Sequence, residues 1–152
     1  MSTSTKPIPP LAVRELRSDA EIESAFALAQ ELRTHLKREQ FLAQVRRQEA
    51  EGYVLIGGFA PELVALAGIR ISSTLARGPH LFVDDLVTAS SVRGKGYGQA
   101  LLRWLAAYAE ARGQTRIYLD SRDTALTFYK KVGFTCLTSV PCWIETDTLK
   151  RD

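Results

Sequence analysis

Cysteine and long apolar stretches are both scarce in this sequence of 152 residues. Its two cysteines, Cys136 and Cys142, are too few for the disulfide framework of a small secreted scaffold. The longest apolar runs, such as residues 63–69, are far shorter than the ~20 residues that a membrane-spanning helix needs. Residues 1–10 lack the apolar core of a signal peptide and contain three prolines. We therefore expect a cytoplasmic protein with a flexible tail at residues 1–10 and a single domain at residues 11–152.

The excess of positive charge is also small. Lysine and arginine number 20, aspartate and glutamate 17, and the net charge is +3. This small charge gives little support to a nucleic acid as partner, and the short apolar runs give none to a membrane, so we expect neither. The excess is concentrated in residues 93–131, where eight basic side chains accompany three acidic ones. This concentration favours a local anion site, although a solvated helix face would give the same pattern.

The spacing of apolar residues predicts a mixed α/β domain in which strands outnumber helices. Helical spacing covers residues 19–36, 39–51, 96–112 and 124–132, with Asp19 and Asp123 as N-caps. Strand-like runs cover residues 11–17, 53–59, 63–72, 81–88, 117–119, 134–140 and 142–146. Residues 60–62 join two of these runs as a hairpin, and Gly133 ends the last helix.

The most specific motif is the glycine loop RGKGYG at residues 93–98, between a predicted strand and a predicted helix. Glycines let the backbone approach a ligand closely, and a helix N-terminus offers unpaired N–H groups to an anion such as pyrophosphate. A dinucleotide-binding fingerprint is excluded because Gln99 stands where its third glycine would be, and a Walker A loop because no serine or threonine follows the lysine. The remaining pattern is [Arg/Gln]-x-x-Gly-x-Gly, with Arg93, Gly96 and Gly98; the alternative is a helix-entry turn without a ligand.

Two adjacent aspartates, Asp84 and Asp85, stand in the middle of the predicted strand LFVDDLVT. Aspartate is disfavoured in strands, so the pair requires an explanation. Strand alternation sends the two side chains to opposite faces, and we expect only one of them to face a cleft. A carboxylate there could take the proton of an attacking amine, directly or through water. The alternative is a buried carboxylate paired with an arginine such as Arg70.

Residues 81–134 resemble the GNAT superfamily of N-acetyltransferases. The resemblance begins with the glycine loop, the strand before it and the helix after it, and a second motif follows about 30 residues later. That motif, A-x-x-F-Y-x-x-x-G-F, is matched by Ala125, Phe128, Tyr129, Gly133 and Phe134. The resemblance implies an α/β (α+β mixed) acyl-CoA N-acyltransferase fold. Its sheet is mixed and mostly antiparallel, splayed at the strand before the glycine loop and flanked by about four helices.

The resemblance also implies a site for acetyl-CoA as co-substrate. The pantetheine arm would lie along the backbone of the strand before the loop, and loop amides would hold the pyrophosphate. The residues so implied are Leu86, Val87, Thr88, Arg93, Gly94, Lys95, Gly96, Tyr97, Gly98 and Gln99. Arg122 stands where many family members carry asparagine, and it could instead meet the phosphates of the cofactor.

Acid and base roles follow from the same resemblance. Tyr129 matches the general acid of the family, and a phenol with a pKa near 10 stays protonated at pH 7 and can give its proton to the departing thiolate. Asp84 is favoured over Asp85 as base, because related polyamine and amino-sugar acetyltransferases use the first acid of such a pair. Neither histidine has metal-ligand spacing with the cysteines, so we expect no metal ion.

These features predict an acetyl-CoA-dependent N-acetyltransferase that acts by direct transfer, without an acetyl-enzyme. The acidic pair favours a cationic primary amine, on a small molecule or a peptide, as the acceptor. The alternative is a non-catalytic acyl-CoA-binding sensor or regulatory module, which the presence of Tyr129 and the aspartates disfavours. The resemblance is also compatible with a homodimer.

Overall fold

The structure, a computed structural model, describes residues 7–151 of the chain. They belong to two compact units that divide after Asp120. Residues 1–6 of the predicted tail lie outside the described residues, and residues 7–11 form neither helix nor strand. The single domain expected over residues 11–152 stays a prediction.

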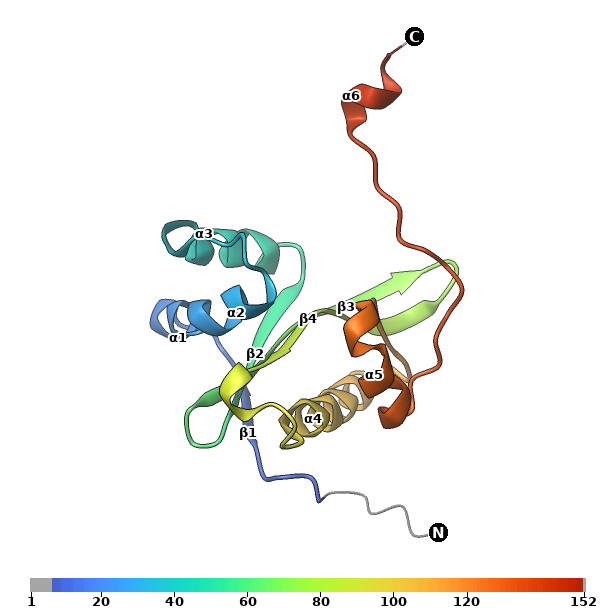
Figure 1. The fold of residues 1–152 in the computed structure, drawn as a ribbon. Helices are drawn as coiled ribbons and strands as arrows, with labels where there is room; N and C mark the ends of the chain where they lie inside the picture. The colour runs from blue at the N-terminus through green and yellow to red at the C-terminus, as the bar shows by residue number, and fades with distance from the viewer. Residues whose placement is uncertain (1–6, 152) are drawn as a thin grey trace. The chain divides into compact units, whose positions relative to one another are not determined.

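Five strands of the first unit form one sheet, in the order β1-β2-β3-β4-β5 (Figure 1). The strands are β1 (Ala12–Glu15), β2 (Tyr53–Phe59), β3 (Leu63–Thr74), β4 (Gly78–Thr88) and β5 (Ile117–Leu119). The pairs β1–β2, β2–β3 and β3–β4 are antiparallel, whereas β5 runs parallel to β4. The predicted mixed, mostly antiparallel sheet is therefore confirmed, together with the hairpin from β2 to β3.

The helices of the first unit are α1 (Asp19–Ser24), α2 (Phe26–Leu32), α3 (Arg38–Glu49) and α4 (Tyr97–Ala111), with a short 3-10 turn, η1, at Ser90–Val92. Helices α1–α3 gather beside β2, and α4 lies against β3 and β4 (Figure 1). The core under α1–α3 includes Phe26, Phe41, Leu66 and Val87, and α4 contributes no residue to it. The two sets of helices therefore bury different parts of the sheet.

The helix predicted over residues 19–36 is broken, and its predicted cap is wrong. Ser18, not Asp19, caps α1: its hydroxyl accepts from the amide of Glu21 at 3.1 Å, and the Glu21 carboxylate accepts from the amide of Ser18 at 3.2 Å. The break falls at Ala25, next to Ser24, whose hydroxyl donates to the carbonyl of Glu21 at 2.6 Å, a bond that bends helices. Helix α2 ends at Leu32, so the five residues before α3 belong to no helix.

The second unit holds a 3-10 turn, η2 (Asp123–Ala125), followed by α5 (Leu126–Val132) and α6 (Thr146–Leu149). Gly133 ends α5 with φ +119°, as predicted, but Asp123 begins the 3-10 turn instead of capping a helix. The strands predicted at 134–140 and 142–146 are wrong, because no strand is present there. Pro141 cannot donate a ladder hydrogen bond, and the apolar side chains after Phe134 are exposed, Trp143 by 85%. Both cysteines lie in this segment, exposed and not disulfide-bonded.

Candidate active site

A β-bulge in β4 places both aspartates on the same side of the sheet. Gly68 of β3 lies opposite Asp85 and Ile69 opposite Val83, so Asp84 is an extra residue in the pairing. An extra residue restarts the alternation of side chains one position later. The expectation that Asp84 and Asp85 lie on opposite faces is therefore wrong, and both line one cavity.

This cavity, which we call the aspartate cavity, has a volume of about 330 Å³ and lies among α2, α3 and strands β2–β4. Most of its wall is apolar, contributed by Ala29, Leu32, Leu36, Phe41, Val45, Leu55, Leu66, Phe82 and Val87. The polar lining residues are Arg33, His35, Gln44, Gln48, Tyr53, Asp84 and Asp85. Concave, mostly apolar cavities with a few convergent polar groups are typical ligand sites.

The two carboxylates have different partners. The Oδ1 of Asp85 accepts from the Arg33 Nε at 2.9 Å, and its Oδ2 accepts from the Tyr53 hydroxyl at 2.8 Å. The Oδ2 of Asp84 accepts from the Arg70 Nε at 2.7 Å, and its backbone carbonyl accepts from the Arg33 Nη2 at 2.8 Å. The pairing of a strand aspartate with Arg70 is thus present, and the role of either aspartate as a base stays a prediction.

Tyr53 reaches Asp85 because Gly68 leaves room for its ring. A Cβ at Gly68 would overlap the hydroxyl and the ring of Tyr53. Burial, with the nearby Asp85 carboxylate as the next cause, raises the pKa of Tyr53 far above its usual value. The tyrosine therefore remains a hydrogen-bond donor that holds Asp85 at any ordinary pH.

We expect Gly68→Ala to lower the free energy of unfolding by about 1–3 kcal/mol, the usual cost of overpacking a core. The φ of Gly68 is not positive, so the effect is one of space. Denaturant unfolding would measure it. Gly58→Ala is the matched control in β2, because its Cβ would meet mainly the end of the Leu11 side chain. An equal loss from Gly68→Ala in a Tyr53→Ala background would contradict the role of the tyrosine ring.

The edge of β4 that faces β5 is open over its last residues. Pairing with β5 covers only Leu81–Val83, so beyond the bulge β4 has no partner on this side among residues 7–151. On its other side, β4 stays paired with β3 up to Thr88. The predicted splaying of the sheet before the glycine loop is confirmed, and the predicted residues Leu86, Val87 and Thr88 lie along the open edge.

The glycine loop leads from this edge into α4. Gly94 and Gly96 have φ values of +81° and +93°, which strongly favour glycine. Helix α4 begins at Tyr97, close to its predicted start, and Gly96 offers no side chain to cap it. The amides of the first turn therefore have no intrahelical partner before the bond from Ala100 to Gly96. Together with the exposed Arg93 and Lys95, they form an arrangement suited to an anion.

Tyr129 and Arg122 belong to the second unit. Tyr129 lies on α5 with 9% of its surface exposed, and its ring packs against those of Phe128 and Phe134 at centroid distances of 5.1 and 5.4 Å. Burial raises the pKa of its hydroxyl, which favours the protonated form that a general acid needs. Arg122 directly precedes η2. The roles assigned to both residues stay predictions.

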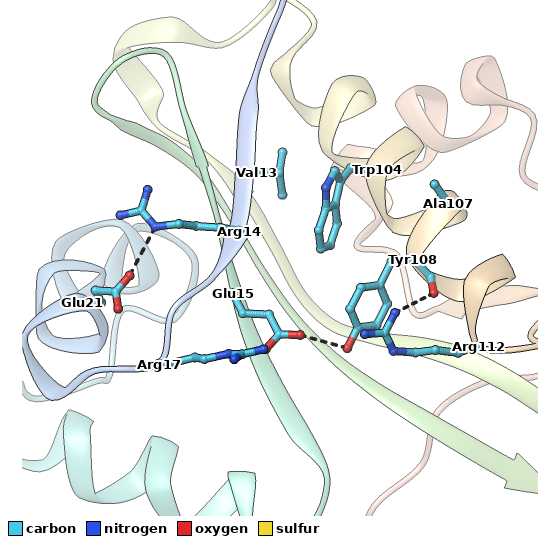
Figure 2. A pocket seen from close by; sticks show the side chains of 9 residues that line it. All are labelled: Val13, Arg14, Glu15, Arg17, Glu21, Trp104, Ala107, Tyr108 and Arg112. Atoms are coloured by element: carbon cyan, nitrogen blue, oxygen red, sulfur yellow. Dashed lines mark hydrogen bonds and ion pairs between the residues drawn. The ribbon is translucent and has the colours of Figure 1, made fainter.

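A second, larger cavity of about 760 Å³ lies between β1 and α4 (Figure 2). The rings of Trp104 and Tyr108 stack there at 5.2 Å, and the Tyr108 hydroxyl donates to Glu15 at 3.4 Å. Its arginines are engaged locally; Arg112, for example, lies over the Tyr108 ring at 3.3 Å. This cavity contains neither aspartate of the bulge, so the aspartate cavity is the stronger candidate for the chemistry.

Sequence reasoning missed Arg33 and Tyr53. Arg33 falls inside the helix predicted over residues 19–36, and only the early end of α2 frees it to reach β4.

Among residues 7–151, no group of three or more His, Cys, Asp or Glu side chains is arranged to hold a metal ion. No helix in the same range is long and apolar enough to span a membrane.

Comparison with known proteins identifies the family. Residues 12–134 match the model of the Acetyltransferase (GNAT) family. YhdJ of Bacillus subtilis, an uncharacterised N-acetyltransferase, is 33% identical over 129 residues, 81% of this chain and 91% of that protein. A glucosamine 6-phosphate N-acetyltransferase of Trypanosoma brucei brucei is 34% identical over 74 residues, 47% of this chain and 50% of that protein.

Solved structures share the fold. An acetyltransferase of Trypanosoma brucei superposes with a TM-score of 0.71 at 26% identity, over 90% of this chain and 100% of the other. The aminoglycoside N-acetyltransferase AAC(6')-Iy, solved in complex with CoA, superposes with a TM-score of 0.77 at 14% identity, over 90% and 95% of the two chains. The family match spans residues 12–134, which include the bulged strand and the glycine loop. The chain therefore belongs to the GNAT family of acetyltransferases and is an acyltransferase enzyme.

Proposed function

We propose that the protein transfers an acetyl group from acetyl-CoA directly to the primary amine of a small molecule or peptide. The bulge in β4 is the observation that carries this proposal. It brings two carboxylates of β4 to the aspartate cavity. The open edge of the same strand leads to the glycine loop. An acceptor amine and an acyl-CoA thioester bound at these places would meet at one strand.

The residues of the loop and strand suit acetyl-CoA. In this proposal the pyrophosphate lies on the amides of residues 93–99, at the start of α4. The pantetheine amides pair with the open backbone edge at Leu86–Thr88, as an added strand would. Arg122, with Arg93 and Lys95, supplies positive charge for the phosphates.

The proposed reaction transfers one acetyl group and one proton. The amine nitrogen attacks the thioester carbonyl, a C–N bond forms, the C–S bond breaks, the nitrogen loses a proton and the CoA thiolate gains one. Forming the neutral amine from a lysine-like ammonium at pH 7 costs about 4.6 kcal/mol, and a base can take up the proton before or during the attack. The Oδ1 of Asp84 has no hydrogen-bond partner among residues 7–151 and is the carboxylate oxygen that can accept this N–H.

Tyr129 is the proposed general acid for the thiolate, in keeping with its raised pKa. The acceptor is proposed to be cationic, because Asp84 and Asp85 are the acidic groups of the cavity. The names of similar proteins point the same way, since glucosamine 6-phosphate and aminoglycosides both carry amines. They support a primary amine as the acceptor and leave its identity open.

Calorimetric titration with acetyl-CoA and with CoA lacking its 3′-phosphate tests the cofactor assignment. We expect micromolar binding of acetyl-CoA and weaker binding of the truncated compound. A panel of amines, followed by the release of free CoA thiol, then tests the transfer. Binding of acetyl-CoA without turnover of any amine would favour the non-catalytic sensor, and no binding by folded protein would overturn the whole proposal.

A further inference from the structure

Arg33 is held at the aspartate cavity by one edge of its guanidinium only. Its Nε and Nη2 donate to the Asp85 carboxylate and to the Asp84 carbonyl, at 2.9 and 2.8 Å. These two nitrogens form one side of the planar group, which fixes its plane. The Nη1 has no partner among residues 7–151, and 39% of the side chain is exposed. Arg33 therefore presents free N–H donors at a residue that lines the cavity.

Asp85 is the anchor of this arrangement and has little capacity left for a ligand. Both of its oxygens are engaged, one by Arg33 and the other by Tyr53. Asp84 is different, because its Oδ1 has no partner while Arg70 holds Oδ2. The cavity thus offers a free acceptor on Asp84 and free donors on Arg33, and the bond from Arg33 to the Asp84 carbonyl keeps these two residues adjacent.

A ligand that donates to the Asp84 carboxylate and accepts from the Arg33 guanidinium carries an ammonium group close to an anionic group. Guanidinium donors bind carboxylates with high geometric specificity, and hydrogen bonds between charged groups are the strong ones. Most of the remaining wall is apolar, with Phe41 and Val45 on α3 and Leu36 shortly before it, and its other polar residues are His35, Gln44 and Gln48. A volume of about 330 Å³ lies at the small end of the range for ligand sites, roughly 300–1,000 Å³.

We propose that the acceptor is a free α-amino acid with an apolar side chain, whose carboxylate is bound by Arg33 and whose amine is bound by Asp84. This inference rests on the proposed acetyl transfer and names the substrate class of the same site. Asp85 and Tyr53 act as positioning residues, because they hold the Arg33 guanidinium. The apolar wall receives the side chain of the amino acid. A peptide would be bound poorly, because its first residue has an amide where the carboxylate should be.

Three ligands of nearly equal size separate the contributions: leucine, leucinamide and 3-methylbutylamine. All three carry a primary amine and the same apolar group, but only leucine has a carboxylate. We expect calorimetry on the CoA-bound protein to show leucine binding ten- to hundredfold more tightly than the other two, the usual effect of a charge-assisted hydrogen bond. With acetyl-CoA, kcat/KM should favour leucine by a similar factor, mainly through KM.

Arg33→Met should remove this preference by weakening the binding of leucine and leaving that of 3-methylbutylamine within about threefold. Arg33→Lys should restore part of it, because the charge returns without the planar fork. Arg14→Ala, which removes an exposed ion-paired arginine from the first unit, is the control and should change neither ratio. The preference ratio is the informative quantity, because a purely structural role of Arg33 would weaken all three ligands alike.

Equal binding of leucine and 3-methylbutylamine by the unaltered protein would overturn the inference. A failure of both ligands to bind would overturn it as well. An unchanged preference in Arg33→Met would overturn it too. These outcomes are distinct from failure of the proposed function. That failure would appear as loss of acetyl-CoA binding, or as acetyl-CoA binding and leucine binding without any acetylated product.

Discussion

Replacing Gly96 with glutamate should abolish measurable binding of acetyl-CoA, a loss of at least about a hundredfold. Two effects act together at this position. The φ of +93° is strained for any residue with a Cβ, and that Cβ would come within 2.9 Å of the Pro9 ring. The added carboxylate would also oppose a pyrophosphate at the start of α4, where the helix favours anions. Calorimetric titration with acetyl-CoA measures the loss.

Gly113→Glu is the matched control for this experiment. Gly113 follows α4 at its other end, has a φ of +77°, and a Cβ there would meet nothing within 4 Å. The backbone strain is therefore similar, while the predicted pyrophosphate site is left intact. Equal losses of acetyl-CoA affinity in the two variants would contradict the assignment of the glycine loop. A thermal unfolding curve for each variant ensures that folded proteins are compared.

Tyr129→Phe should lower kcat by about 10²–10⁴-fold, the usual contribution of a positioned acid, while the affinity for acetyl-CoA stays within about threefold. The phenylalanine keeps the ring contacts with Phe128 and Phe134 and removes only the hydroxyl group, and with it the acidic proton. Because burial raises the pKa of Tyr129, the unaltered enzyme should not lose activity through deprotonation of this group until the pH exceeds the usual pKa of a phenol, near 10. Release of free CoA thiol measures turnover, and calorimetry measures affinity.

Tyr108→Phe provides the comparison, because Tyr108 is a partly buried tyrosine of the second, larger cavity, and burial raises its pKa as well. We expect it to leave kcat within about threefold. If Tyr129→Phe reduced turnover and acetyl-CoA affinity by the same factor, the residue would support binding and would not be the acid. If both tyrosine variants kept full turnover, another group or water would protonate the thiolate.

Most of the sheet could be predicted from the sequence because local patterns decide it. The runs that form β2 and β3 are apolar, end at turn residues and pair as neighbours, so short-range rules suffice. The start of α4 could also be predicted, because the glycines before Tyr97 mark where a helix can begin after a left-handed turn. In both cases the deciding residues lie within a few positions of one another.

The site depended on features that no local pattern reveals. The bulge at Asp84 reflects how β4 pairs with β3, and alternation within β4 alone gave the wrong faces. The partners of the aspartates come from distant positions: Arg33 is 52 residues before Asp85, and Tyr53 is 32 residues before it. The prediction of strands at the C-terminus was wrong for the opposite reason. Their local pattern was strand-like, but residues 135–145 are all exposed and Pro141 interrupts the run.

The bulge also determines which kinds of sequence change this fold can accept during divergence. A substitution at one position of β4 alters one side chain, whereas deletion of the extra residue would restore regular pairing with β3 and remove one of the two carboxylates from the cavity. Arg33 would then lose the Asp84 carbonyl to which it donates, although the later residues of the strand kept their pairing with β3. Loss or gain of a single residue in this strand is therefore a more informative marker of altered activity among relatives than the percentage of identical residues.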